Sequence, residues 1–326
     1  MEKKLTLLLC LKDRSEYTES WIENNICNDY EYIIADGSKN DKNFIIFNKI
    51  KFQNVKYIKY GYDKDIGTYI EKVIDAIKKV TTPYVMRVDN DDIVVKKGLN
   101  AMIATLEKNN QYGIAQANMR GIFMKNNTLK NPKYSVVPGM KEKFSDLVDL
   151  NGLQAIEKVL NPYRQIWYGV YKTSVYKKVW CDISESKLDN IFLIEFLQAQ
   201  LALIHSKMIY LNETYYLRLS NPTSSTTLNN QKSDYPDWQR IYFDEEYRNE
   251  VGKMASYISD KLNCEEEKLY NVYRKMFSSF DSRNDRIRIV ALKIIKLLIS
   301  RLLLSIIPYV NGKKLKSISS FLNYMK

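Results

Sequence analysis

The sequence predicts an α/β protein whose mainly parallel sheet is flanked by helices and followed by a helical C-terminal extension. Three observations lead to this prediction. Apolar patterns of period 2 and period 3.6 alternate over the first hundred residues, which calls for right-handed βαβ crossovers. The 326 residues are 45% hydrophobic, which is enough for a sizeable core. Apolar strands also end abruptly in carboxylates, at the edge where open α/β sheets place their ligands.

The first part of the chain contains the clearest alternation. Strands are expected at Leu5–Leu11, Tyr32–Ala35, Val55–Tyr60 and Tyr84–Val88, and helices at Ser15–Asn25, Phe44–Ile50, Ile66–Val80 and Lys97–Lys108. Neither GxGxxG nor GxxxxGK[ST] occurs there, which argues against a dinucleotide dehydrogenase or a P-loop NTPase.

After Gly113 the elements become shorter and the turns more frequent. We expect a strand at Ile166–Tyr171, helices at Thr173–Trp180 and Lys187–Leu203, and strands at Ile209–Leu211 and Tyr215–Leu219. The predicted organisation is a first domain over residues 1–225, divided into halves 1–112 and 113–225, and a helical region over residues 226–326.

The cysteine and histidine content limits the possible chemistry. The four cysteines are scattered without CxxC spacing and no signal peptide precedes Leu5, so we expect reduced thiols in a cytoplasmic protein. The single histidine, His205, excludes a His-rich zinc site. Because His205 lies in an apolar run, we expect it to have a hydrogen-bonded structural role. Acid/base chemistry therefore falls mainly to carboxylates.

One acidic stretch follows directly on a predicted buried strand. Asp89, Asp91 and Asp92 lie within four residues and repel one another unless a cation or a hydroxyl-rich ligand compensates their charge. A hard divalent metal is the simplest explanation. An acidic turn capping the helix that starts near Lys96 is the alternative.

The net charge of +12 is concentrated in the C-terminal tail. From Arg283 to Lys326 ten Lys and Arg stand against the single acid Asp285, a net +9, so nucleic-acid binding is not predicted for the slightly basic remainder. Residues 286–307 predict an amphipathic helix with a basic strip, too charged to cross a bilayer but suited to an anionic membrane surface. Packing on the rest of the chain, or on a dimer partner, is the alternative.

Four segments together resemble those of a known family. They are residues 6–14 at the first strand, Asp36-Gly37-Ser38-Lys39-Asn40-Asp41 at the second, residues 62–72, and Asp89-Asn90-Asp91-Asp92. In order and spacing they resemble the inverting family 2 glycosyltransferases of GT-A (Rossmann-like) fold, particularly those of bacterial capsule or lipopolysaccharide synthesis. The resemblance implies transfer of a sugar from a nucleotide-diphospho-sugar donor to a hydroxyl of a glycan or lipid-linked acceptor. It also implies that residues 1–112 bind the donor, that residues 113–225 face the acceptor, and that the protein is peripheral on the inner face of the cytoplasmic membrane.

The resemblance assigns donor-side roles to five residues. Asp36 matches the carboxylate that accepts a hydrogen bond from the base, although it could simply form a turn before Gly37. Asp89 matches the residue near the ribose or a metal-bound water, and Asp91 the direct ligand of Mg²⁺ or Mn²⁺. Arg14 and Lys72 are further candidates for phosphate or base contacts, or else surface cations. The family's common Thr-Tyr-Asn-Arg is replaced here by Leu11-Lys12-Asp13-Arg14, which puts the base contacts of that segment in question.

Inverting transfer also needs a carboxylate that deprotonates the acceptor hydroxyl. By position Asp189 matches this base best, and a helix N-terminal residue favoured by the macrodipole is its alternative role. Glu195 and Asp182 are the next candidates. On the acceptor side, Trp167 and Tyr168 could stack on a sugar or belong to the core, and Arg218 could reach a phosphate.

Two other functional classes remain open at this point. A sugar nucleotidyltransferase would share the sheet and the acidic metal site, but it usually has a Gly-rich basic loop after the first strand, where this chain has Lys12-Asp13-Arg14-Ser15. A non-enzymatic, basic protein that binds membranes or nucleic acid is the other possibility.

Overall fold

The computed structural model describes residues 2–50, 52–124, 134–136, 144–219 and 245–279. By compactness the chain divides into one unit from Met1 to Met276 and a second from Phe277 to Lys326. The whole sheet belongs to the first unit. Both the domain boundary predicted at residue 225 and the basic helix predicted at 286–307 fall outside the described residues.

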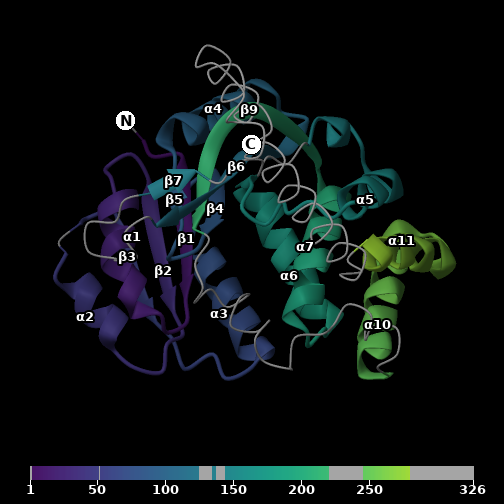
Figure 1. The fold of residues 1–326 in the computed structure, drawn as a ribbon, viewed down its shortest axis with the longest axis horizontal. Coiled ribbons are helices and arrows are strands. Elements are labelled where there is room, and N and C mark those ends of the chain that lie inside the picture. Colours follow the sequence, from purple (N-terminus) through teal and green to yellow (C-terminus); the bar gives the residue numbers. More distant parts are fainter. Residues whose placement is uncertain (1, 51, 125–133, 137–143, 220–244, 280–326) are drawn as a thin grey trace, which may run out of the picture. The chain divides into compact units, whose positions relative to one another are not determined.

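A nine-stranded sheet runs through the described residues in the order β3-β2-β1-β4-β8-β6-β9-β5, with β7 paired to β6 (Figure 1). The parallel half consists of β3 (Val55–Lys59), β2 (Glu31–Asp36), β1 (Leu5–Leu11) and β4 (Tyr84–Val88). The mixed half consists of β8 (Val170–Lys172), β6 (Tyr112–Met124), β9 (Lys207–Leu219), β5 (Ile93–Val94) and β7 (Tyr134–Val136). The predicted α/β fold with a mainly parallel N-terminal half is confirmed.

The helices of the first half are η1 (Ser15–Tyr17), α1 (Thr18–Asn25), α2 (Lys42–Asn48), α3 (Ile66–Lys78) and α4 (Lys96–Lys108). Those that follow are η2 (Ser145–Leu147), α5 (Gly152–Leu160), α6 (Thr173–Ser186), α7 (Ile191–His205), α10 (Glu245–Leu262) and α11 (Glu266–Ser279). None of the helices in these ranges is long and apolar enough to span a bilayer.

Helix α7 is the centre of the helical layer. It packs against α5, α6 and α10, and α6 in turn packs against α3. A helix that is apolar on nearly every side must be buried on every side, and two of its buried amides make hydrogen bonds to tyrosine hydroxyls. Gln198 donates to the Tyr171 hydroxyl at 2.9 Å, and Gln200 accepts from the Tyr273 hydroxyl of α11 at 2.7 Å.

Three predicted elements need correction. The helix expected from Lys187 begins only at Ile191, because Lys187 adopts a left-handed φ of 55° and the Asn190 side chain caps the new helix. Residues Ile166 to Gly169 form a turn closed by the Gly169 N–H on the Ile166 carbonyl (3.1 Å), so the strand β8 is shorter than expected. The two strands expected after His205 are one strand, β9, which follows β6 through several register shifts.

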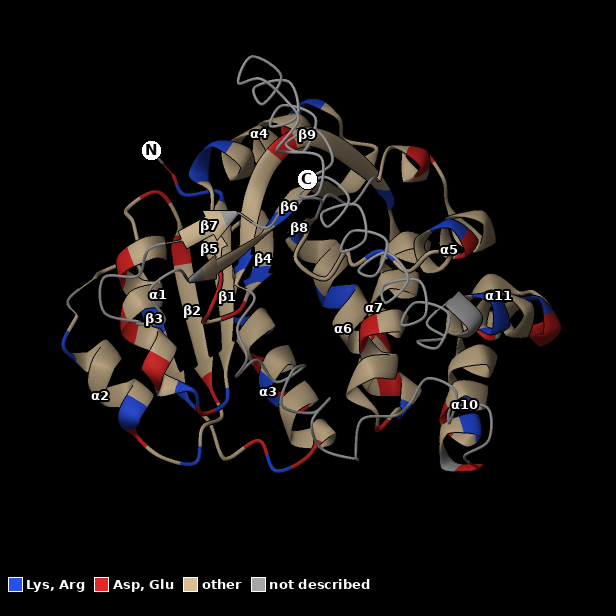
Figure 2. Cartoon of the chain, viewed as in Figure 1, with Lys and Arg blue, Asp and Glu red and all other residues tan. Residues whose placement is uncertain are grey.

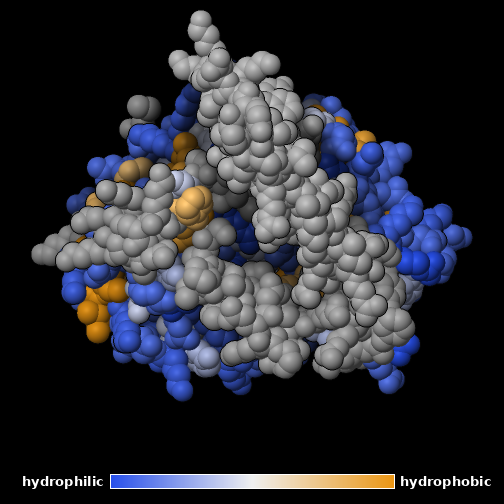
Figure 3. All heavy atoms as spheres, in the orientation of Figure 1, coloured by the Kyte–Doolittle hydropathy of each residue, from blue (hydrophilic) through white to orange (hydrophobic). Residues whose placement is uncertain are grey.

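The surface of the first unit is largely polar. In Figure 2 strands β1 and β2 are uncharged along most of their length, with an acidic residue at the end of β2. Figure 3 shows one group of hydrophobic side chains where Figure 1 places α2, and the exposed apolar residues of that helix are Phe44 and Ile45. Phe44 and Phe47 of α2 line a small pocket there together with Phe52 and Tyr57 of the segments that follow.

Candidate functional site

The carboxyl ends of the parallel strands bring the predicted acidic residues to one edge of the sheet. Leu11, Asp36 and Lys59 stand in register as the last residues of β1, β2 and β3. Strand β4 ends at Val88, so Asp89 is the first residue beyond it. The sequence pattern predicted this meeting, since parallel strands that end in carboxylates must place them along a common rim.

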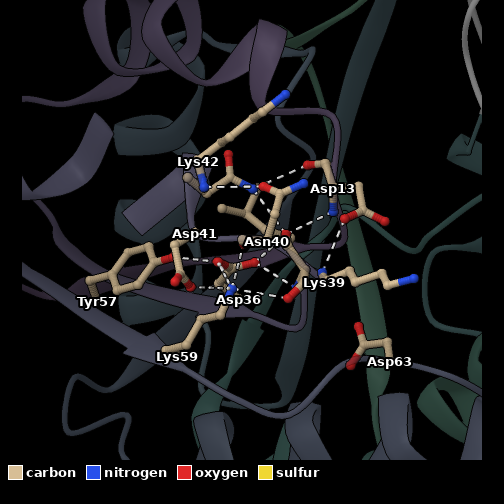
Figure 4. Close-up of polar contacts among 12 residues, drawn as sticks. Asp13, Asp36, Lys39, Asn40, Asp41, Lys42, Tyr57, Lys59 and Asp63 are labelled. Atoms are coloured by element: carbon tan, nitrogen blue, oxygen red, sulfur yellow. Dashed lines mark hydrogen bonds and ion pairs between the residues drawn. The ribbon is translucent and has the colours of Figure 1, made fainter. Parts of the chain in front are cut away.

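Asp36 is fully buried in a set of donors that come from β3 and from its own turn (Figure 4). Its Oδ1 accepts from the Ser38 N–H at 2.8 Å and from the Ser38 hydroxyl. Its Oδ2 accepts from the Tyr57 hydroxyl and, at 3.2 Å, from the Lys59 ammonium. Lys59 also donates to the Ser38 and Asn40 carbonyls. These contacts fix both carboxylate oxygens in one orientation.

The loop between β1 and η1 connects this group to the acidic loop. Asp13 and Arg14 both have left-handed backbones, with φ of 57° and 53°, a conformation that costs free energy in a non-glycine residue. Side chains of both neighbouring segments hold it. The Asp13 N–H donates to Ser38 Oγ at 2.7 Å, and the Asn90 amide donates to the Arg14 carbonyl at 2.9 Å.

Arg14 reaches the acidic loop with its side chain. Its Nη2 donates to Asp91 Oδ2 at 2.7 Å, and its guanidinium lies over the Tyr17 ring at 4.6 Å. The Asp91 side chain is only 9% exposed. The structure therefore joins two of the predicted site residues in an ion pair.

The acidic loop crowds three carboxylates. Asp92 is buried, and its Oδ1 accepts the Leu219 N–H of β9 at 2.7 Å. Burial, followed by the charges of Asp91 and Asp89, nevertheless raises the pKa of Asp92 well above its usual range. Burial and the two neighbouring carboxylates thus disfavour the charged form of Asp92.

Asp89 lies beside two stacked tyrosine side chains. The Tyr168 hydroxyl donates to Asp89 Oδ2 at 2.5 Å, and the Tyr168 ring stacks on Tyr216 at 4.7 Å. Burial, with the Asp89 charge, raises the pKa of Tyr168 well above its usual range, so this hydroxyl remains a neutral donor. Arg87 Nη2 lies 3.7 Å from Asp89 Oδ1, and its guanidinium lies 4.6 Å from the centre of the Trp167 ring. Trp167 is only 6% exposed and packs against Arg87 and Trp180.

Glu195 of α7 belongs to a second network at this site. Its Oε1 accepts from the Tyr163 hydroxyl at 2.6 Å and from the Gln165 amide at 2.9 Å, and Arg218 Nη1 donates to Gln165 Oε1 at 3.0 Å. Burial raises the pKa of Glu195, and the Tyr163 hydrogen bond and the Arg218 charge oppose the rise. Against the effect of its own burial, Tyr168, Asp92, Glu195 and Asp89 raise the pKa of Arg218. Arg218 is therefore a permanent cation between the two networks.

Lys72 lies deeper than the other donor-side candidates. It is 3% exposed, its ammonium donates to the Leu11 carbonyl at 2.9 Å, and it forms an ion pair with Asp63. Asp63 in turn stands against Gly37, where even a Cβ would meet its carboxylate at 2.2 Å. In this arrangement Lys72 supports the turn that carries Asp36.

The other two carboxylates considered as the base lie in different surroundings. Asp189 is exposed, precedes the cap of α7, and donates its N–H to Glu250 of α10 at 2.8 Å. Asp182 accepts from Lys261 at 2.9 Å and lies 2.7 Å from His205 Nε2. That contact confirms the predicted structural role of His205.

The donor set fits a divalent cation that the substrate helps to ligate. Within the described ranges no group of three or more His, Cys, Asp or Glu side chains could hold a metal alone. Mg²⁺ commonly binds one or two protein carboxylates together with substrate phosphates. Asp91 and Asp89, beside Asp92, whose charged form is disfavoured by burial and by both of them, offer such a partial set.

Sequence reasoning missed several residues of the site. Tyr57 and Lys59 could have been found, because they lie two residues apart on β3 and so share the face and register of Asp36. Gln165 and Arg87 gave no signal, since a lone amide before a turn and a lone cation in a strand are common without function.

Comparison with known proteins supports the fold. No family model matches the chain, and no curated protein matches it. Among solved structures, S. aureus TarS 1–349 in complex with UDP-GlcNAc has a TM-score of 0.56 at 15% identity, covering 84% of this chain and 73% of that one. Another structure of S. aureus TarS 1–349 has a TM-score of 0.51 at 14% identity, covering 87% and 91%. These likenesses confirm the α/β fold of GT-A type, and at this identity they establish the fold alone.

Proposed function

We propose that this chain is a metal-dependent inverting glycosyltransferase. It moves a sugar from a nucleotide-diphospho-sugar to a hydroxyl of a glycan or lipid-linked acceptor in bacterial surface-polysaccharide synthesis. The observation that carries the proposal is the convergence of the Asp36 group, the acidic loop and the Glu195 network on one edge of the sheet. A structural neighbour with this fold binds UDP-GlcNAc.

On the donor side, the fixed Asp36 carboxylate accepts a hydrogen bond from the base, and Asp91 and Asp89 hold Mg²⁺ or Mn²⁺. Such a cation neutralises charge on the departing nucleoside diphosphate. Tyr168 keeps the Asp89 carboxylate in place through its 2.5 Å hydrogen bond. Lys72 acts indirectly, through Asp63 and the turn at Gly37.

For the base we favour Glu195 over Asp189, the positional match. Gln165 joins Glu195 to Arg218, whose charge also interacts with Asp89. Burial raises the pKa of Glu195, which makes its carboxylate a stronger base. Both hydrogen bonds to Glu195 go to Oε1, and Oε2 has no hydrogen-bond partner among the described residues. The Asp189 backbone contacts α10 instead, and the Asp182 carboxylate is in contact with Lys261 and His205.

The reaction follows from these positions. Glu195 takes the proton of the acceptor hydroxyl while its oxygen attacks the anomeric carbon from the face opposite the diphosphate. The bond between that carbon and the diphosphate oxygen breaks, and its electrons leave with the nucleoside diphosphate. Arg218, cationic throughout, stabilises the charges that change during transfer.

A matched pair of variants tests the base. Glu195→Gln should lower the transfer rate by roughly a hundredfold or more while donor affinity survives, since the group is needed in the transition state. Asp189→Asn should change the rate less than about threefold, the size of a surface effect. Transfer is measured with UDP-GlcNAc and other nucleotide sugars, and donor affinity by calorimetry. The opposite ranking of the two variants would return the role to Asp189.

We also propose that the basic stretch 286–307 attaches the protein to the anionic inner surface of the cytoplasmic membrane. Each cation near such a surface contributes about 1 kcal/mol, so the net +9 of the whole tail, residues 283–326, suffices for reversible attachment. A chain ending at Asp281 should stay folded, keep donor hydrolysis, and lose salt-sensitive binding to phosphatidylglycerol vesicles. Vesicle binding that survives the truncation in full would place the membrane contact elsewhere.

A further inference from the structure

The Arg14–Asp91 ion pair occupies the carboxylate that the proposed function assigns to the cation. Arg14 Nη2 lies 2.7 Å from Asp91 Oδ2, with the guanidinium against the Tyr17 ring. The two side chains are 25% and 9% exposed, so this contact is far better shielded from solvent than an ordinary surface pair. A guanidinium and a divalent cation cannot both sit on the same carboxylate oxygen.

The arrangement around Arg14 is fixed at its backbone and incompletely satisfied at its side chain. The left-handed backbone of Asp13 and Arg14 is held by Ser38 and Asn90. The buried Arg14 Nε, by contrast, has no hydrogen-bond partner in the part of the chain that the structure describes, which costs free energy in a group of this kind. The guanidinium can therefore improve its hydrogen bonding by turning toward an anionic ligand, while its backbone stays in place.

We propose that Arg14 acts as a latch. In the free protein its guanidinium occupies the Asp91 carboxylate in place of the divalent cation. When the cation binds, the guanidinium moves to the donor diphosphate. The inference rests on the proposed function, because it needs a cation at Asp91 and a diphosphate beside it. Its consequence is that the protein binds the cation weakly alone and more tightly together with the donor. The coupling must be reciprocal, so the cation also increases donor affinity.

The latch predicts effects of opposite sign for one substitution. Without the guanidinium, the cation no longer competes with Arg14 for Asp91, so Arg14→Gln should bind Mn²⁺ in the absence of nucleotide roughly five- to twentyfold more tightly. The same variant lacks a diphosphate contact, so at saturating Mn²⁺ it should bind UDP roughly five- to tenfold more weakly. Damage to the fold would weaken both.

The matched control is Lys12→Gln. Lys12 lies two residues earlier in the same loop, and its ammonium lies over the Tyr62 ring at 5.3 Å rather than on the acidic loop. Lys12→Gln also removes one positive charge from this loop. It therefore distinguishes an effect of the Arg14–Asp91 contact from an effect of net charge. If Arg14→Gln fails to fold, Tyr17→Phe gives a second test, since the Tyr17 hydroxyl hydrogen-bonds the guanidinium. That variant should shift Mn²⁺ affinity in the same direction by a smaller factor.

The experiment titrates Mn²⁺ into the full chain and follows the signal of free Mn²⁺ by electron paramagnetic resonance, with and without UDP. Tighter Mn²⁺ binding by Arg14→Gln, with Lys12→Gln like the wild type, supports the latch. Equal Mn²⁺ affinity in wild type and Arg14→Gln, lost in Asp91→Asn, overturns the latch and keeps the metal site. Absence of Mn²⁺ binding in every form, with UDP present, overturns the metal site itself and the latch with it.

Discussion

The two acidic ends of the parallel strands differ in how their charge is compensated. At the end of β2, the single carboxylate of Asp36 receives Ser38, Tyr57 and Lys59, and both of its oxygens are occupied. Beyond β4, three carboxylates lie within four residues. Arg14 contacts Asp91, Tyr168 and Arg87 contact Asp89, and the Leu219 N–H contacts Asp92, whose pKa is strongly raised by burial and by the other two carboxylates. At the end of β2 one carboxylate is held by hydrogen bonds on both oxygens, whereas beyond β4 neighbouring carboxylates disfavour each other's charged form.

If the proposed function holds, this difference predicts two kinds of binding site along one rim. A carboxylate held by neutral hydroxyls and one ammonium loses little free energy on presenting the same orientation to a nucleobase, since it is already ordered. Crowded carboxylates store unfavourable electrostatic free energy, which an arriving cation releases. The Asp36 end should therefore govern nucleotide affinity, and the acidic loop should govern metal dependence.

The largest effect is expected at the acidic loop. Asp91→Asn should abolish Mn²⁺-dependent transfer, because the metal supplies several kcal/mol of charge stabilisation, roughly a thousandfold or more in rate. The fold should survive, since Asp91 lies at the rim outside the apolar core. Transfer is measured against Mn²⁺ concentration, with thermal unfolding as the check on folding. Turnover with an unchanged Mn²⁺ dependence would show that Asp91 is not a ligand.

A smaller effect of a different kind is expected at Asp36. Asp36→Asn replaces the acceptor of Tyr57 and Lys59 by an amide, and losing a hydrogen bond to a charged group costs about 1.5–3 kcal/mol, roughly ten- to a hundredfold in UDP affinity. Mn²⁺ affinity in the absence of nucleotide should not change. UDP binding by calorimetry and Mn²⁺ binding by paramagnetic resonance test both halves. Loss of Mn²⁺ affinity in this variant would mean that the two ends are not independent.

The elements that sequence reasoning located best are those whose patterns need no partner. Strands β1 and β4 lie where predicted, because a continuous apolar run between polar boundaries has no competing interpretation at that length. The sequence pattern predicts two strands in place of β9, because the polar residues Asn212 and Glu213 interrupt it. Pairing with β6 keeps the chain extended through them, and the sequence of β9 alone does not reveal that pairing.

The same distinction, between a signal within one segment and a signal that needs a partner, applies to the residues of the candidate site. Asp36, Asp89 and Asp91 could be found because a carboxylate at the end of an apolar strand is itself the signal. Glu195 stood only as a second choice for the base. What favours it is the contact of Gln165 with Arg218, residues separated from it by 30 and 23 positions in the chain. The role of Lys72 likewise depends on how deeply it is buried, which a charge in a helical pattern does not reveal.

The smallest predicted effect concerns the pH dependence of transfer and tests Glu195 from a different direction. A general base acts only when deprotonated, so kcat/KM rises with pH through its pKa in the free protein. Burial raises the pKa of Glu195 and the hydrogen bond from the Tyr163 hydroxyl lowers it, because that bond stabilises the carboxylate.

Tyr163→Phe keeps the ring that packs edge-on against Phe196 at 4.7 Å and removes the stabilisation of the charged form. The acid limb of the profile should therefore move to higher pH. Tyr112→Phe is the control, because its hydroxyl donates to Asp149 at 2.7 Å in a contact outside the Glu195 network, and its profile should match the wild type. An acid limb that stays in place in Tyr163→Phe, or moves downward, would mean that the titrating base is a different carboxylate.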